Sequence, residues 1–152
     1  MMAVETYLSL IPEDPFFVPP EKARERAETR FEFFGPRASE IRILVTDTPD
    51  FIFPAQNWDG VYCRECDADL NEWLGEALKR TEESHFTSLN STLPCCGCEL
   101  SLNDLRYGET AGFARFVLQA WCVSGIDRLP PRQHEELEAL LGCKLRQVWS
   151  LS

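Results

Sequence analysis

An α+β fold is predicted for this chain by two observations. Its 152 residues are 44% hydrophobic, which is enough for one compact core. The order strand, helix, strand is predicted once before and once after a central segment that holds most of the cysteines. We therefore expect a single domain over residues 1–152, with an insertion between two similar halves.

The first half is expected to contain three strands and one helix before the insertion. Residues 6–11 are mostly apolar and end at a proline cluster, as a short strand does. Residues 21–34 follow two prolines and end at Gly-Pro, which predicts a helix. Apolar residues alternate over 41–46, which predicts a half-buried strand. We expect a turn at 47–50 and a second strand at 51–53, so that the two strands form a hairpin.

The remaining elements are predicted by the same signals. Residues 71–83 have an amphipathic helical pattern, and 86–93 have the composition of a strand. Residues 113–123 form an apolar, aromatic stretch that we interpret as a long strand. Two prolines open a helix over 132–141, and a strand over 143–151 follows. Outside the middle, this is the element order of a ferredoxin-like fold with split βαβ halves.

Two Cys-x-x-Cys pairs lie in the middle of the chain. They are Cys63-Arg64-Glu65-Cys66 and Cys95-Cys96-Gly97-Cys98. Two residues between paired cysteines allow one tight turn to direct both sulfurs at one ion, and zinc takes four such ligands in a tetrahedron. We therefore predict a structural Zn²⁺ bound by Cys63, Cys66, Cys95 and Cys98, in a zinc ribbon inserted as a subdomain over 62–107.

The residues after each pair also match. Both pairs are followed by an acid, two further residues, Leu-Asn and a second acid, with Leu70-Asn71 in the first case and Leu102-Asn103 in the second. The chain resembles the zinc-ribbon class at this point, and its stretch 93–107 looks like a group of uncharacterised bacterial proteins with two such knuckles. The resemblance is strongest over 62–116. It implies a metal-bound fold and supplies no activity.

The acidic net charge of the chain favours some classes of binding partner over others. The net charge is −10, and residues 59–106 hold ten acids and four bases. A phosphate backbone would be repelled by this segment, so nucleic acid is not the partner we expect. A protein partner with a basic surface fits better, and an immunity or inhibitor-like protein that covers a basic toxin is one such hypothesis.

The expected compartment is the cytoplasm. Residues 1–10 have no basic segment followed by an apolar core, so an export signal is not expected there. No stretch reaches the roughly 18 to 20 apolar residues that a membrane helix needs. Reduced thiols and a bound metal suit this compartment better than disulfides do.

A zinc-dependent cytidine or nucleobase deaminase is the alternative function. Such enzymes carry His or Cys, any residue, Glu, and later Pro-Cys-x-x-Cys. Here Cys63, Cys95 and Cys98 would bind the metal, a water would take the fourth position, and Glu65 would transfer protons. Cys66 departs from that pattern, because its thiolate would close the open position. We therefore expect a binding protein rather than an enzyme.

Five other cysteine and histidine residues could be reactive groups or metal ligands, but each has a simpler structural interpretation. Cys96 is expected to be a turn residue inside the second knuckle, and His85 a loop residue near the site. Cys122 and Cys143 lie in apolar segments and are expected in the core. His134 belongs to a charged helix and is expected at the surface.

Overall fold

The computed structural model describes residues 5–123 and 128–151, within which three α-helices and eight β-strands form an α+β fold, as predicted. Four strands make the main sheet in the order β2-β7-β1-β8, and every neighbouring pair is antiparallel. These strands are β1 (Thr6–Pro12), β2 (Glu40–Ile52), β7 (Gly112–Trp121) and β8 (Leu145–Leu151). The chain between β2 and β7 forms a second, smaller layer of structure.

Strand β2 is one continuous element, so the predicted hairpin is wrong. Its residues pair with β7 on both sides of a register shift between Val45 and Asp50. Within the shift, the Arg115 Nε–H donates to the carbonyl oxygen of Thr46 at 2.9 Å. The turn-forming residues 47–50 therefore make an irregularity against β7 instead of reversing the chain.

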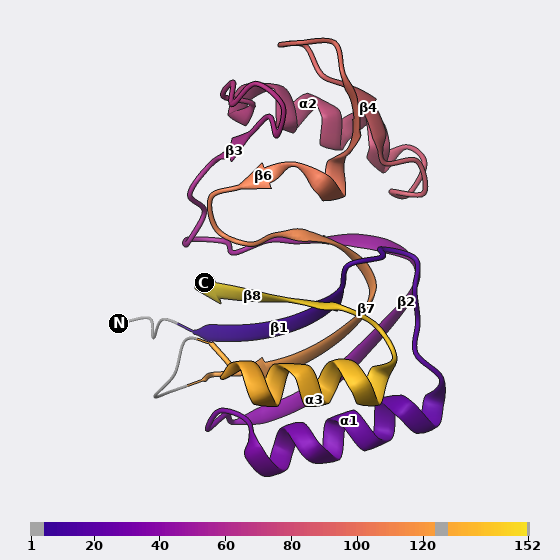
Figure 1. Cartoon of the computed structure of the whole chain (residues 1–152), viewed down its shortest axis with the longest axis vertical. Helices are drawn as coiled ribbons and strands as arrows, with labels where there is room; N and C mark the ends of the chain where they lie inside the picture. Colours follow the sequence, from indigo (N-terminus) through magenta and orange to yellow (C-terminus); the bar gives the residue numbers. More distant parts are fainter. Residues whose placement is uncertain (1–4, 124–127, 152) are drawn as a thin grey trace.

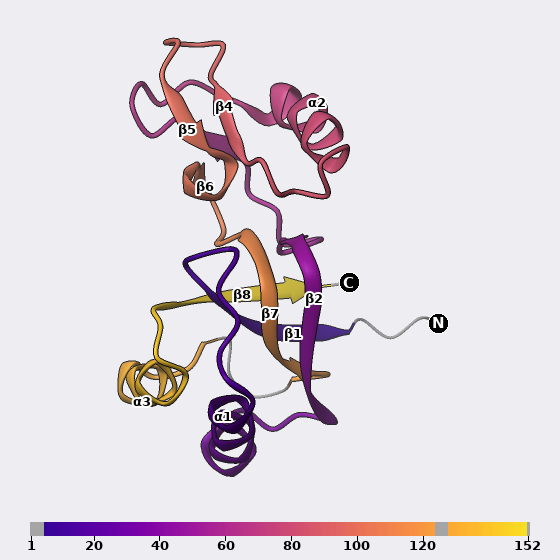
Figure 2. The same cartoon turned by 90° about the vertical axis from the view of Figure 1, so that its right-hand side faces the viewer.

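Two helices cover one face of the sheet (Figures 1 and 2). They are α1 (Glu21–Phe34) and α3 (Pro131–Leu141), and Arg30 and Glu136 join them through an ion pair of 2.9 Å. The left-handed backbone of Gly142, with φ +76°, ends α3. The core between helices and sheet is made largely of the fully buried residues Leu8, Leu10, Ala27, Phe31, Phe116, Leu118, Leu137 and Leu141.

The other face of the sheet is partly enclosed because the sheet curls. Its buried cluster consists of Ile11, Ala114, Val117 and Val148. Beyond β2 the chain runs along the outer edge of β8, where the Gln56 N–H donates to the Leu151 carbonyl at 2.8 Å and the Leu151 N–H donates to the Pro54 carbonyl at 3.3 Å. Since β2 and β8 are opposite edges of the sheet, this pairing brings the two edges together.

The insertion lies beyond the end of the sheet that is remote from α1 and α3 (Figure 1). Its elements are β3 (Val61–Tyr62), α2 (Asn71–Glu82), β4 (Asn90–Thr92), β5 (Glu99–Ser101), the 3-10 helix η1 (Leu102–Asp104) and β6 (Arg106–Tyr107). β3 pairs with β6, and β4 pairs with β5. The strand predicted at 86–93 is shorter than expected, because His85 and Phe86 have left-handed backbones with φ +55° and +59°.

Aromatic side chains join the insertion to the sheet. Phe51 of β2 and Phe113 of β7 stack with ring centres 4.8 Å apart. Phe86 lies 5.4 Å from Phe113, and Trp58 and Tyr107 both contact Phe51. The hydrophobic cluster of the insertion, which includes Phe113, is therefore anchored on the sheet.

Within the described residues, no helix combines the length and the apolar composition that crossing a membrane requires. The expectation drawn from residues 1–10 rests in part on residues 1–4, which lie outside the described residues. The cytoplasmic location stays a prediction.

Candidate metal centre

The first Cys-x-x-Cys pair lies in a tight turn that leaves β3. The Cys63 N–H donates to the Ala68 carbonyl at 3.0 Å, and the Asp67 N–H donates to the Cys63 carbonyl at 3.0 Å. Asp67 has a left-handed backbone with φ +62°, which Asp tolerates better than most residues. Its carboxylate accepts a hydrogen bond from Arg106 Nη2 at 2.6 Å. The turn places Cys66 immediately before this left-handed residue.

The second turn, between β4 and β5, has the same hydrogen bonds. The Leu93 N–H donates to the Cys98 carbonyl at 2.9 Å, and the Gly97 N–H donates to the Leu93 carbonyl at 3.0 Å. Gly97 has φ +75°, so it is the left-handed residue of this turn. Each turn thus has four residues between its hydrogen-bonded ends, and in each the last of the four is left-handed.

The structure and the sequence pattern disagree on which cysteine of the second turn corresponds to Cys66 of the first. The matching Leu-Asn residues aligned Cys66 with Cys98. The hydrogen bonds instead align Cys66 with Cys96, and Cys63 with Leu93. In the sequence, Gly97 is the residue that indicates the equivalence of Cys96 and Cys66, because a left-handed residue follows the second cysteine of each turn.

Four sulfurs gather between the two turns. The Sγ atoms of Cys63, Cys66, Cys95 and Cys96 all lie within 4.8 Å of one another, close enough to hold a metal ion. Three predicted ligands are thus together, and Cys96 completes the group. Cys98 lies outside this group of four, with its Sγ 3.2 Å from that of Cys96.

Two of the sulfur separations fit a tetrahedral ion. Four sulfurs at about 2.3 Å from zinc stand about 3.8 Å apart. The Sγ atoms of Cys63 and Cys96 are 3.8 Å apart, and those of Cys95 and Cys96 are 3.9 Å apart. The distance of 3.2 Å between Cys96 and Cys98 is too short for two ligands of one zinc ion. One of the two can therefore take the fourth position; Cys96 belongs to the group within 4.8 Å, and the Cys98 thiol also interacts with that of Cys63.

The site lies at the protein surface, and one of its four cysteines is buried. Cys63 is fully buried, whereas Cys66, Cys95 and Cys96 are exposed. Burial acts to raise the pKa of Cys63, but backbone N–H groups of Cys66 and Glu65 and the thiols of Cys95 and Cys66 donate hydrogen bonds to its sulfur and lower that pKa to about 6. Cys63 is thus prepared to bind metal as a thiolate.

The thiol of Cys95 behaves in the opposite way. Desolvation and its hydrogen bonds to Cys66, Cys63 and Cys96 raise its pKa to about 12. Without metal, the Cys63 thiolate therefore lies beside a protonated Cys95 thiol. A bound cation replaces thiol protons, so metal binding releases protons.

Glu65 contacts the sulfur group through its backbone. Its side chain is exposed, and its backbone N–H contacts the Cys63 sulfur at 3.4 Å. Cys66, which the deaminase hypothesis leaves idle, is inside the sulfur group. These positions favour a closed four-sulfur site over an open catalytic one.

The other singled-out residues lie apart from the sulfur group. Cys122 is exposed and has φ +54°, so its predicted place in the core is wrong, because the chain turns there as β7 ends. Cys143 packs against the core as predicted, and burial raises its pKa to about 11. His134 is half-buried rather than exposed, since its Nδ1 lies 2.9 Å from Gln147 Nε2. His85 is a loop residue, as expected, but it is not part of the sulfur group.

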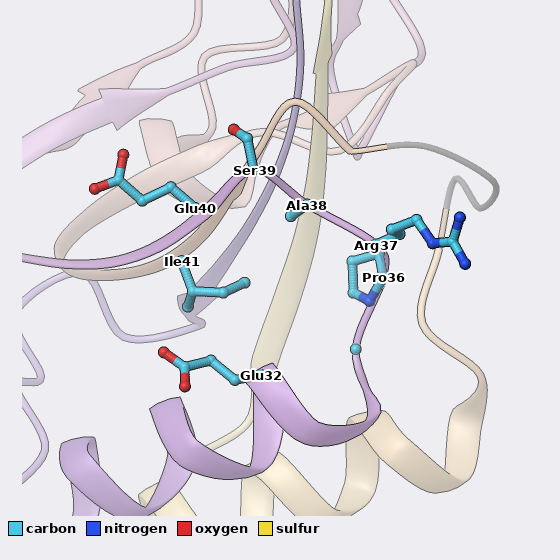
Figure 3. Close-up of a pocket in the computed structure, with 8 residues that line it drawn as sticks. Glu32, Pro36, Arg37, Ala38, Ser39, Glu40 and Ile41 are labelled. Carbon is cyan, nitrogen blue, oxygen red and sulfur yellow. The ribbon is translucent and has the colours of Figure 1, made fainter.

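A pocket of about 620 Å³ lies where α1 leads into β2, far from the sulfurs in the sequence. Figure 3 shows Glu32, Glu40 and Arg37 around it, with the Arg37 guanidinium pointing away from both carboxylates. Its charged groups do not converge on one point, so it offers no recognisable binding chemistry.

No protein-family model, no curated protein and no solved structure matches this chain. A cluster of four cysteine sulfurs with the spacing of a tetrahedral metal site is the feature on which a function must rest.

Proposed function

We propose that this protein is a metal-stabilised recognition protein, in which one structural Zn²⁺ is bound by Cys63, Cys66, Cys95 and Cys96. The single observation that carries this proposal is the group of four sulfurs within 4.8 Å of one another. Thiolates select zinc among the abundant divalent ions, and four of them leave no position for a reactive water. The ion would therefore hold two turns together rather than catalyse a reaction.

The finer description of the fold belongs to the same proposal. We infer a ferredoxin-like sheet with split βαβ halves and a zinc-ribbon subdomain inserted over 62–107. The strand order β2-β7-β1-β8, the antiparallel neighbours and the positions of α1 and α3 support this assignment. The separate hydrophobic cluster of the insertion supports the subdomain.

The partner that this surface fits best is a protein with a basic face. Residues 59–106 carry a net charge of −6, and a zinc ion with four thiolates adds about −2. On α2, Glu72 and Glu76 are exposed one turn apart. Such a surface repels nucleic acid and attracts basic protein surfaces. An immunity or inhibitor-like role against a basic toxin is the specific form of this proposal.

Quantitative capture of partners tests the role. The zinc-loaded protein and a Glu72→Lys/Glu76→Lys variant are each used as bait in an extract of the source cells, at low and high salt. We expect the wild type to enrich a protein whose contact face is basic, and the variant to lose it, because the charges would then repel. Cross-linking followed by mass spectrometry identifies the contacting segment.

The matched control is Glu21→Lys/Glu25→Lys, which reverses two exposed acids one turn apart on α1 and so changes the charge by the same amount. It is expected to retain the partner. Zinc content of all three proteins shows that the metal centre is intact. Enrichment of RNA or DNA in place of a protein, or equal loss with both variants, would contradict the proposed recognition surface.

A further inference from the structure

A second polar pocket, of about 310 Å³, lies where the insertion meets β8. Three arginines line it: Arg64, Arg106 and Arg146. Asp104 is the acid among its lining residues, so the charged side chains of the pocket sum to about +2, whereas the whole chain carries −10. A local excess of positive charge on so acidic a protein marks this pocket as distinct from the rest of the surface.

Arg146 is held rigidly at the pocket. Its Nη1 donates to the carbonyl oxygens of Asn103 at 2.8 Å and Ala111 at 3.2 Å, and its Nη2 lies 3.6 Å from an Asp104 carboxylate oxygen. Its side chain keeps 21% of its surface exposed. A guanidinium fixed in this way loses little conformational entropy when it binds a ligand.

The side-chain amide of Asn103 lies against Arg146 and is buried, with 3% of the residue exposed. Its Nδ2 donates to the Glu13 carbonyl at 2.8 Å, and its Oδ1 accepts from the Phe113 N–H at 2.8 Å. These contacts come from the segment after β1 and from β7, so the pocket is built on the sheet as well as on the insertion.

The other two arginines differ in how much of their charge is already neutralised. Arg106 pairs with Asp67 and lies over the Tyr62 ring at 4.9 Å. Arg64 is exposed, and its Nη1 is 3.5 Å from the Asp104 carbonyl oxygen. Within residues 5–123 and 128–151, no carboxylate lies within 4.0 Å of the Arg64 guanidinium. Arg64 therefore has charge to offer a ligand.

We propose that this pocket binds the oxyanion group of a small metabolite, either a phosphate ester or a carboxylate. The guanidinium groups of Arg64 and Arg146 supply several N–H donors in planes that match such oxygens. The volume, near the lower end for ligand pockets, fits a small molecule and is too small for a polymer backbone. Arg64 lies between Cys63 and Cys66, so the metal-bound turn presents it to the pocket.

Calorimetric titration of the zinc-loaded protein with inorganic phosphate and with malonate tests this proposal. We expect saturable binding of at least one anion at low ionic strength, weakened by added chloride. Tighter binding of phosphate indicates a phosphate ester as the natural ligand, and tighter binding of malonate indicates a carboxylate. Arg64→Gln should weaken binding by about tenfold or more, because charge-assisted hydrogen bonds are lost.

Arg42→Gln is the matched control, because Arg42 lies on β2 outside the pocket and pairs with Glu40. It should leave the affinity unchanged. Zinc content is measured in every variant, so loss of the pocket is separated from loss of the metal centre. Arg146→Lys, on β8 and in contact with neither turn, replaces Arg64→Gln if the latter lowers zinc content. Absence of saturable binding by both anions, or equal weakening by Arg42→Gln, would overturn the proposal.

Discussion

Cys96 and Cys98 lie two residues apart, and the sulfur separations make one of them the fourth ligand. We expect Cys96→Ser to lose zinc and to melt at lower temperature, because three sulfurs then remain in the group. Cys98→Ser should keep about one zinc per chain and a melting temperature near that of the wild type. Elemental analysis and calorimetry of the two purified variants measure both quantities. The reverse result would show that Cys98, and not Cys96, is the fourth zinc ligand.

Glu65 separates a closed structural site from a catalytic one. Because its side chain is exposed, Glu65→Gln should leave zinc content unchanged and alter the free energy of unfolding by no more than about 0.5 kcal/mol. We expect neither variant nor wild type to release ammonia from cytosine or adenine compounds. Ammonia release by the wild type that disappears in Glu65→Gln would establish the deaminase alternative.

The sequence predicted Cys63, Cys66 and Cys95 as neighbours because Cys-x-x-Cys spacing is dictated by turn geometry. It did not predict the place of Cys96. The choice between Cys96 and Cys98 depends on which residues close the second turn, and Leu93 closes it from the strand side. The Leu-Asn match aligned Cys66 with Cys98. The left-handed backbone of Gly97 instead aligns Cys66 with Cys96, because a left-handed residue follows both.

Helix α1 carries a row of acids whose effect on stability depends on pH. Partial burial, together with repulsion from Glu32 and Glu25, raises the pKa of Glu28 above its usual 4.5. An acid with a raised pKa in the folded state binds its proton more tightly there, so stability falls as pH rises from about 4.5 through the folded pKa. Glu28→Gln should therefore stabilise the protein at pH 7, by about 0.5 kcal/mol or less because the carboxyl group is only partly buried and solvent screens the repulsion.

Urea denaturation of wild type and Glu28→Gln at neutral pH and at about pH 4 measures this difference. We expect the advantage of the variant to shrink at the lower pH, where the wild-type carboxyl is protonated. Glu135→Gln, on the exposed side of α3, is the control for loss of one charge. An advantage that stays constant with pH would show that ionisation of Glu28 is not its cause.

Elements with strong local signals were predicted well. The prolines before α1 and α3 and the glycines after them set boundaries that depend on a few adjacent residues. Strand β2 was divided in two because residues 47–50 have the composition of a turn. Their pairing with β7 is decided by residues more than sixty positions away, which local composition does not report.

On the scale of the whole molecule, the cluster of the insertion and the cluster beneath α1 and α3 predict two different responses to metal removal. Chelation should expose the amides of β3 to β6 to hydrogen exchange, because the turns lose the ion that joins them. Amides of β1, β7 and β8 should stay protected, since the cluster beneath α1 and α3 contains none of the cysteines of the two pairs. Exchange measured by mass spectrometry, with and without a zinc chelator, reports both regions in one experiment.

A Cys63→Ser/Cys66→Ser variant serves as a second metal-free state that does not depend on the chelator. It should show the same pattern of exchange. Loss of protection throughout the sheet would mean that the chain unfolds as one cooperative unit, and the subdomain over 62–107 would then have no separate stability. The shared Phe113 is the residue through which such coupling would pass.

The pairing of the 54–56 segment with β8 also bears on self-association. An open sheet edge offers unpaired N–H and carbonyl groups to a strand from another chain, which is a common route to aggregation. β8 is hydrogen-bonded to β1 on one side and to Pro54 and Gln56 on the other near its end, so strand addition is blocked there. The remaining edge of the main sheet is β2, where Pro49 has no N–H and the register is broken. The route that the chain takes into its insertion thus protects the sheet against edge-to-edge growth.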